Sequence, residues 1–134
     1  MIVVDASVAI KWFKQDENSQ EADFYLNAHL SGRETIFIPI LFMYEVANAL
    51  FFSKRLDAAE VRQILDSLIH LNLIAVAPDT DLLNASVDIA ETYKLSVYDA
   101  SYLALAQKLN CAFVTADKKM FEKIKSLIEI TLIK

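Results

Sequence analysis

The stretch MIVVDAS, residues 1–7, decides the fold, because an apolar run there ends abruptly in the carboxylate of Asp5. A short run of β-branched residues without polar alternation is typical of a strand buried on both faces of a sheet. Residues 6–13 then take on helical character. Asp5 therefore stands where a buried parallel strand ends and a helix begins, the edge at which open α/β sheets bind ligands. The alternative is that Asp5 only caps the helix, a common role for aspartate.

The rest of the chain repeats this alternation of apolar strands and helices. Further strands are expected at residues 35–38, 73–76, 112–115 and 128–133, and further helices at residues 19–30, 40–53, 57–71, 80–93, 95–106 and 118–124. The connections are long enough for parallel pairing, so the sequence predicts a single α/β domain over residues 1–134. The inward face of the helix at 80–93 is expected to carry Leu83, Val87, Ala90 and Tyr93.

Composition limits the compartments in which this chain is expected to work. Hydrophobic residues make up 55% of the 134 residues, which is enough for a large core. No apolar run approaches the roughly 20 residues needed to span a bilayer, and the start of the chain shows no signal peptide. The single cysteine, Cys111, fits a reducing compartment. We therefore expect a cytoplasmic protein with no membrane partner.

Charge and residue content argue against several familiar kinds of site. The net charge of −5 is not that of a protein that coats nucleic acid with a basic face. An enzyme that binds nucleic acid through a metal-loaded acidic pocket is still open, because bound divalent ions reverse the local sign. With one glycine, at position 32, the chain has no glycine-rich phosphate-binding loop. Its two histidines both lie in helical stretches, so a histidine-based zinc site is not expected.

Glu45 is an anomaly in the helix expected at residues 40–53. Its neighbours on the helix surface, three and four residues away, are Leu41, Phe42, Asn48 and Ala49, none of which is a cation. A carboxylate on an apolar face is costly unless it is paired, protonated or bound to a metal. Glu45 is therefore a candidate site residue, with Asn48 as the other polar group on the same side.

Two aspartates stand at helix starts in the second half of the chain. Asp99 opens a helix so rich in alanine and serine that it must pack very closely against a neighbour. Asp117 follows the strand at 112–115, much as Asp5 follows the first strand. A capping box between Ser96 and Asp99 is the structural alternative for that residue.

These four carboxylates share one expected location, and they are Asp5, Glu45, Asp99 and Asp117. If the first and fourth strands are neighbours, the sheet changes winding direction between them and opens a crevice at their carboxyl ends. Like charges that converge there cannot all ionise without a cation. An oxygen-only cluster suits Mg²⁺ or Mn²⁺, and such an ion supports phosphodiester hydrolysis. Ser7 and Thr115 would hold a carboxylate or a water beside the ion.

The motifs around these acids resemble those of the PIN-domain nucleases, and specifically the VapC-type toxins of toxin–antitoxin pairs. The four motifs occur in the family's order at residues 3–7 (VVDAS), 44–50 (YEVANAL), 97–106 (VYDASYLALA) and 114–117 (VTAD). Any one of them is a weak signal, whereas all four at the family's spacing are specific. The match extends from residue 1 to about residue 134, and no acidic position departs from the pattern.

The resemblance implies a three-layer α/β/α fold of PIN type, with a parallel sheet in strand order 3-2-1-4-5 and helices on both faces. It also implies a Mg²⁺- or Mn²⁺-dependent endoribonuclease. Asp5 and Asp99 would be the main metal ligands and Asp117 a further one. Glu45 would complete the pocket or act through water.

Partners are implied by the same resemblance. The substrate would be a structured or single-stranded RNA, and the chain would form a homodimer that a small antitoxin holds inactive. Lys118 and Lys119, directly after Asp117, are the best candidates for contacts with an RNA backbone. A solvated surface is the structural alternative for each of these two lysines.

Three other interpretations differ in the residues that they require. A receiver-like phosphoacceptor domain needs an acidic pair after the first strand and an aspartate ending the third, but the chain has Asp5 alone and ends its third strand with Ala77-Pro78. A haloacid-dehalogenase-like phosphatase needs Asp-x-Asp after the first strand, and Ser7 takes the second position here. A catalytically silent PIN-fold binding protein would have the same fold but no catalytic activity. The complete set of four acidic residues argues against this interpretation.

Overall fold

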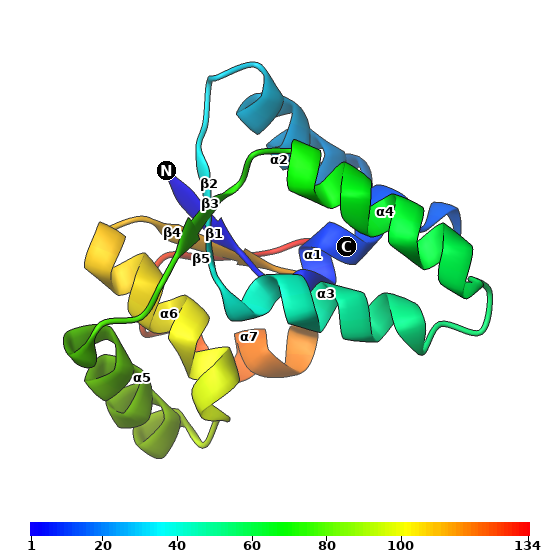
Figure 1. The fold of residues 1–134 in the computed structure, drawn as a ribbon. Coiled ribbons are helices and arrows are strands. Elements are labelled where there is room, and N and C mark those ends of the chain that lie inside the picture. The colour runs from blue at the N-terminus through cyan, green and yellow to red at the C-terminus, as the bar shows by residue number, and fades with distance from the viewer.

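The computed structural model describes all 134 residues and contains a five-stranded parallel sheet in the order β3-β2-β1-β4-β5 (Figure 1). The strands are β1 Ile2–Val4, β2 Ile36–Pro39, β3 Ile74–Val76, β4 Ala112–Thr115 and β5 Ile130–Leu132. β1 lies at the centre, with Ile2 opposite Ile36 of β2 and Val4 opposite Val114 of β4. The predicted strand order is confirmed, and the change of winding direction falls between β1 and β4.

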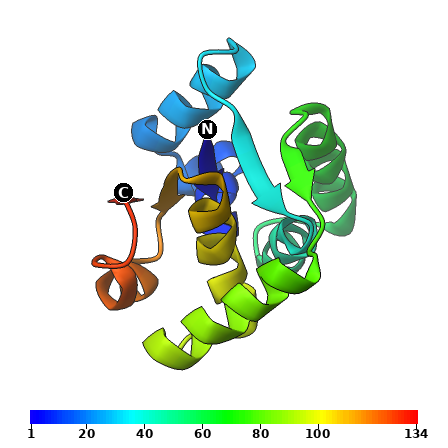
Figure 2. The same cartoon turned by 90° about the vertical axis from the view of Figure 1, so that its left-hand side faces the viewer.

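Helices connect the strands and cover both faces of the sheet, as two perpendicular views show (Figures 1 and 2). They are α1 Ala6–Phe13, α2 Gln20–Leu30, α3 Leu41–Phe51, α4 Ala58–His70, α5 Thr80–Tyr93, α6 Val97–Leu109 and α7 Lys118–Ile124, with a short 3₁₀ helix at Gln15–Glu17. The expected elements are all present, although β5 is shorter than the strand expected at 128–133. None of the helices combines the length and the apolar character that crossing a bilayer requires.

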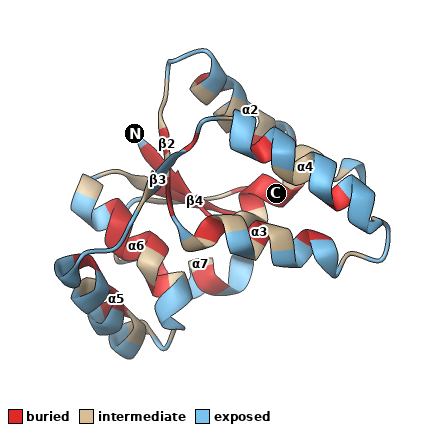
Figure 3. Ribbon diagram, viewed as in Figure 1, coloured by how far each residue is buried: buried red, intermediate tan, exposed pale blue.

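The core lies between the central strands and α6, where buried residues are concentrated (Figure 3). Val3 and Val4 of β1 have no exposed surface, as expected for a strand covered on both faces. α6 packs directly against β1, β2 and β4. Its buried face includes Ala100, Ala104 and Ala106, and such small side chains let a helix approach the sheet closely. This packing brings the start of α6, which carries Asp99, next to the carboxyl end of β1.

The prediction for the inward face of α5 is wrong for Leu83 and Val87, whereas Ala90 and Tyr93 do pack against the core. Leu83 and Val87 are 50% and 51% exposed, whereas the buried residues are Leu82, Ser86 and Ile89. α5 packs mainly against α6, so α6 sets its inward face. That face is rotated by one residue, or about 100°, from the expected one. Ser86 tolerates burial because its hydroxyl donates to the Leu82 carbonyl at 2.8 Å.

Candidate acidic active site

A cavity of about 270 Å³ opens beside the carboxyl ends of β1 and β4. All four predicted carboxylates line it, and they are Asp5, Glu45, Asp99 and Asp117. They come from four places in the fold: the end of β1, the middle of α3, the first turn of α6 and the N-terminal cap of α7. Ser7, Asn48 and Tyr102 add polar groups to the lining, and no lysine or arginine belongs to it. The structure therefore brings the predicted acids together without a cationic side chain.

Asp5 is the most enclosed of these carboxylates, with 6% of its surface exposed. The hydroxyl of Ser7 donates to its Oδ1 atom, and the hydroxyl of Thr115 donates to its Oδ2 atom. The backbone N–H of Val8 lies 3.3 Å from Oδ1, so Asp5 also caps α1. Capping and membership of the site are thus not alternatives for this residue, because both follow from its place at the end of β1.

The two hydroxyls that bind Asp5 are themselves fixed by the backbone after β4. The Ala116 N–H donates to Ser7 Oγ at 2.9 Å, and the Asp117 N–H donates to Thr115 Oγ1 at 3.0 Å. Each hydroxyl therefore accepts one hydrogen bond from the backbone and donates one to Asp5. This network ties the end of β1 to the end of β4 and fixes the orientation of the Asp5 carboxylate.

Burial raises the pKa of Asp5 from 3.8 to about 6. The hydrogen bonds from Ser7, Thr115 and Val8 lower the pKa and so offset part of this effect, while the nearby charge of Asp117 raises it further. A buried carboxylate with a raised pKa in an open cavity is the kind of group that a bound cation or a reaction uses.

The same physical cause acts on Glu45 and Asp99. Burial raises the pKa of Glu45, the hydrogen bond from Tyr102 opposes that shift, and the charges of Asp99 and Asp5 raise the pKa again. Burial likewise raises the pKa of Asp99, with Ser96 lowering it and Asp117 raising it. Repulsion is therefore distributed over the cavity, and a divalent cation would relieve it.

The raised pKa of Asp5 predicts that the metal-free chain loses stability as the pH rises. A folded-state pKa of about 6 against 3.8 means that the folded chain binds the proton more tightly than the unfolded chain. The penalty is absent below pH 3.8, grows between 3.8 and 6, and reaches about 3 kcal/mol above pH 6.

Urea unfolding in chelator at several pH values, on the wild type and Asp5→Asn, measures this penalty. The stability difference between the two proteins should shift by about 3 kcal/mol in favour of Asp5→Asn between pH 4 and pH 7. Comparing the two proteins cancels the titration of the groups that do not interact with Asp5. A difference that does not change with pH would show that Asp5 titrates normally.

Tyr102 is a site residue to which the sequence-based hypothesis assigns no role, although it lies within the third motif. Its side chain is 1% exposed, and its hydroxyl donates to Glu45 Oε2. Burial and the neighbouring charge of Glu45 raise the pKa of Tyr102, so the hydroxyl keeps its proton and acts as a donor. The sequence feature that could have identified Tyr102 as a site residue is its spacing from Asp99. The two residues are three positions apart and therefore share one side of α6.

Three lysines of α7 lie close in sequence to the acid Asp117. Lys118 and Lys119 are exposed and do not line the cavity. Lys123, one turn further along α7, exerts a charge effect that lowers the pKa of Asp99. Its Nζ atom donates to the Lys94 carbonyl at 3.1 Å, which holds it at the junction between α5 and α6. Lys123 is therefore a further cation beside the acids, and the RNA contacts of Lys118 and Lys119 stay a prediction.

The donor chemistry of the cavity fits a hard divalent cation, because its ligating groups are carboxylate and hydroxyl oxygens. No three Asp, Glu, His or Cys side chains are grouped so that they could hold a metal ion among themselves. Mg²⁺ does not need such a group, since it usually keeps several waters and takes one or two carboxylates. The three-carboxylate set of Asp5, Asp99 and Asp117 stays a prediction.

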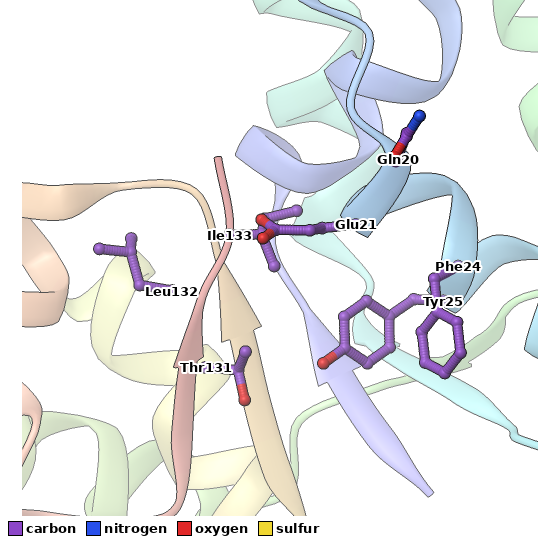
Figure 4. A pocket seen from close by; sticks show the side chains of 7 residues that line it. All are labelled: Gln20, Glu21, Phe24, Tyr25, Thr131, Leu132 and Ile133. Carbon is purple, nitrogen blue, oxygen red and sulfur yellow. The ribbon is translucent and has the colours of Figure 1, made fainter.

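A larger hollow of about 400 Å³ lies away from these acids, between α2 and β5 (Figure 4). Its lining includes Phe24, Tyr25 and Ile133 and one carboxylate, that of Glu21. Glu21 already accepts a hydrogen bond from the backbone N–H of Lys134 at 2.6 Å. This hollow lacks the paired titratable groups that hydrolysis needs, so the smaller acidic cavity is the candidate active site.

Comparisons with known proteins agree with this geometry. The family model described as PIN domain matches residues 2–127. Ribonuclease VapC9 of Mycobacterium tuberculosis is 34% identical to the chain, over 99% of this chain and 98% of that protein. VapBC2 from Rickettsia felis, solved bound to a DNA fragment from their promoter, has a similar fold with a TM-score of 0.75, 16% identity and full coverage of both chains. A toxin-antitoxin complex from Klebsiella pneumoniae has a TM-score of 0.71 and 19% identity over 98% of this chain and 96% of that one.

Proposed function

Because this chain belongs to the PIN domain family, we propose that it is a Mg²⁺- or Mn²⁺-dependent endoribonuclease. The observation that carries the proposal is the convergence of Asp5, Glu45, Asp99 and Asp117 on one cavity with no cationic side chain in its lining. The similarity to a protein named as a ribonuclease supports RNA as the substrate. An acidic cavity accepts a polyanion only with a cation bound, which is why the metal belongs to the proposal.

A divalent ion in this cavity would lower the pKa of a water molecule and neutralise charge on the phosphate oxygens. Asp5 supplies a preoriented carboxylate, because Ser7 and Thr115 fix both of its oxygens. Asp99 and Asp117 add carboxylates from two helix starts. Asp5 has a raised pKa of about 6 without metal, so binding of the ion near or below that pH would release its proton.

In the proposed hydrolysis, a water molecule cleaves the bond between phosphorus and a ribose oxygen. The oxygen of a water molecule forms a new bond to phosphorus, the bond to a ribose oxygen breaks, and that ribose oxygen leaves with a proton. The ribose 2′-hydroxyl takes no part. The product phosphate therefore keeps one oxygen from water, and no 2′,3′-cyclic phosphate forms.

Cleavage of a circular RNA in ¹⁸O-labelled water with Mg²⁺ tests this account. We expect linear product, since an endonuclease needs no free end, with one ¹⁸O atom in each new terminal phosphate. A 2′-deoxy substitution at the cleaved nucleotide should leave the cut in place. Cyclic phosphate ends, or loss of cleavage at the deoxy position, would point to attack by the 2′-hydroxyl and contradict the proposal.

The chain is further proposed to be the toxin of a VapBC-type pair. Its similarity to a protein named VapC and its fold similarity to members of toxin–antitoxin complexes support this assignment. The partner would be a small antitoxin that blocks access to the acidic cavity. Co-purification of the chain with the product of a small adjacent gene, together with loss of RNA cleavage in that complex, is the test.

We also propose that the chain forms a homodimer, as the resemblance to VapC-type toxins implies. Exposed hydrophobic side chains on its surface support this proposal. Large hydrophobic side chains are exposed around α3, α5 and α6, including Tyr44, Leu83, Val87 and Tyr98. An apolar hollow of about 280 Å³ lies among these helices. Exposed apolar side chains beside an apolar hollow are a feature of protein interfaces. Sedimentation velocity of the purified chain measures whether two copies associate.

A further inference from the structure

Tyr102 is buried at the acidic cavity, yet the reaction as proposed gives it no part. It belongs to α6, and its ring packs against Phe113 of β4 with the ring centroids 6.2 Å apart. Neighbouring core residues therefore fix the ring, and with it the position of the hydroxyl. Glu45 is the only hydrogen-bond partner of that hydroxyl within the chain.

The contact between these two residues is asymmetric. Tyr102 is 1% exposed, and a buried hydroxyl that is left unpaired is costly. Glu45 is half-buried on α3, and its neighbours Asn48 and Ala49 on the cavity side are exposed. A glutamate side chain that is free to rotate loses conformational entropy when it is ordered. The rigid partner therefore sets the orientation of the flexible one.

The hydrogen bond also distinguishes the two oxygens of Glu45. Oε2 accepts the Tyr102 hydroxyl, whereas Oε1 has no hydrogen-bond partner in the chain. With Oε2 engaged, Oε1 is the atom left to accept hydrogen bonds from water in the cavity. A side chain without this anchor would exchange its two oxygens and sample several rotamers.

We propose that Tyr102 is a positioning residue of this site, which holds Glu45 so that Oε1 serves the water around a divalent ion. The inference rests on the proposed function and adds to it a residue that acts through Glu45. Outer partners of this kind typically change metal affinity or activity by about 10- to 100-fold when they are removed.

Four proteins test the inference: the wild type, Tyr102→Phe, Glu45→Ala and the double variant. Calorimetry gives the Mn²⁺ affinity of each, and RNA cleavage gives kcat and KM. Tyr102→Phe should weaken Mn²⁺ binding and lower kcat about tenfold, with KM for RNA unchanged. In the Glu45→Ala background, where Tyr102 has no carboxylate to hold, the same change should have little further effect. Tyr93→Phe is the matched control, because Tyr93 is half-buried on α5 and its hydroxyl has no hydrogen-bond partner in the chain.

The outcomes separate the inference from the proposed function. Wild-type Mn²⁺ affinity and kcat in Tyr102→Phe would overturn the inference, and so would an equal loss in both backgrounds, which indicates general disruption of the core. If the wild type cleaves no RNA but Tyr102→Phe still weakens Mn²⁺ binding through Glu45, the positioning role stands and the ribonuclease assignment fails.

Discussion

Replacing Asp5 with asparagine should abolish RNA cleavage and leave the chain folded. The substitution removes the charge of the most enclosed carboxylate while keeping its shape and its place between Ser7 and Thr115. Losing one preorganised electrostatic contact in an active site costs about 10²- to 10³-fold in kcat. The loss should be at least that large, because Asp5 is proposed to ligate the ion as well.

Single-turnover cleavage in excess enzyme measures this loss without interference from product release. Asp88→Asn is the matched control, because Asp88 is an exposed residue of α5 outside the cavity lining. Thermal unfolding in chelator should show Asp5→Asn gaining stability relative to the wild type as the pH rises from 4 to 7, since burial penalises the Asp5 charge. Cleavage by Asp5→Asn at the wild-type rate would remove this carboxylate from the mechanism.

Removing divalent ions should abolish cleavage as completely as the Asp5 substitution does. Burial and mutual repulsion raise the pKa of Asp5, Glu45 and Asp99, and no lysine or arginine in the lining compensates. Without a cation, the cavity would repel the phosphate. Adding Mn²⁺ back should restore the rate and stabilise the chain by about 2.7 kcal/mol when free Mn²⁺ is 100 times Kd.

A titration of activity and of the unfolding midpoint against Mn²⁺ follows both effects together. The two curves should have the same half-saturating Mn²⁺ concentration. In Asp5→Asn, Mn²⁺ should not shift the unfolding midpoint. Dialysis against chelator before the assay excludes carried-over ions. Full cleavage in excess chelator would rule out the metal, and a stabilisation that survives in Asp5→Asn would place the ion elsewhere.

The sequence predicts best those site residues that follow a strand. Asp5 and Asp117 each follow an apolar strand, and parallel strands present their carboxyl ends at one edge of a sheet. Glu45 was predictable for a different reason, as a carboxylate with no cationic neighbour on its helix. The strand order needed the family resemblance, because local patterns do not say which strands pair.

What the sequence does not predict depends on how separate elements pack. The hydrogen bond between Tyr102 and Glu45 joins residues 57 positions apart, and it exists only because α6 and α3 meet at the cavity. The inward face of α5 is set by α6, and Ser86 on that face has the polarity of a surface residue. The charge effect of Lys123 on Asp99 likewise follows from the docking of α7 and not from any motif.

The central claim is that the acidic cavity binds a divalent ion between the ends of β1 and β4. A crystal of the wild-type chain soaked in Mn²⁺ and measured at the manganese absorption edge tests it most directly. We predict one strong anomalous peak within the cavity, with Asp5 and Asp99 in or next to its coordination sphere. An empty cavity at millimolar Mn²⁺, or a peak bound only at another surface, would contradict the account.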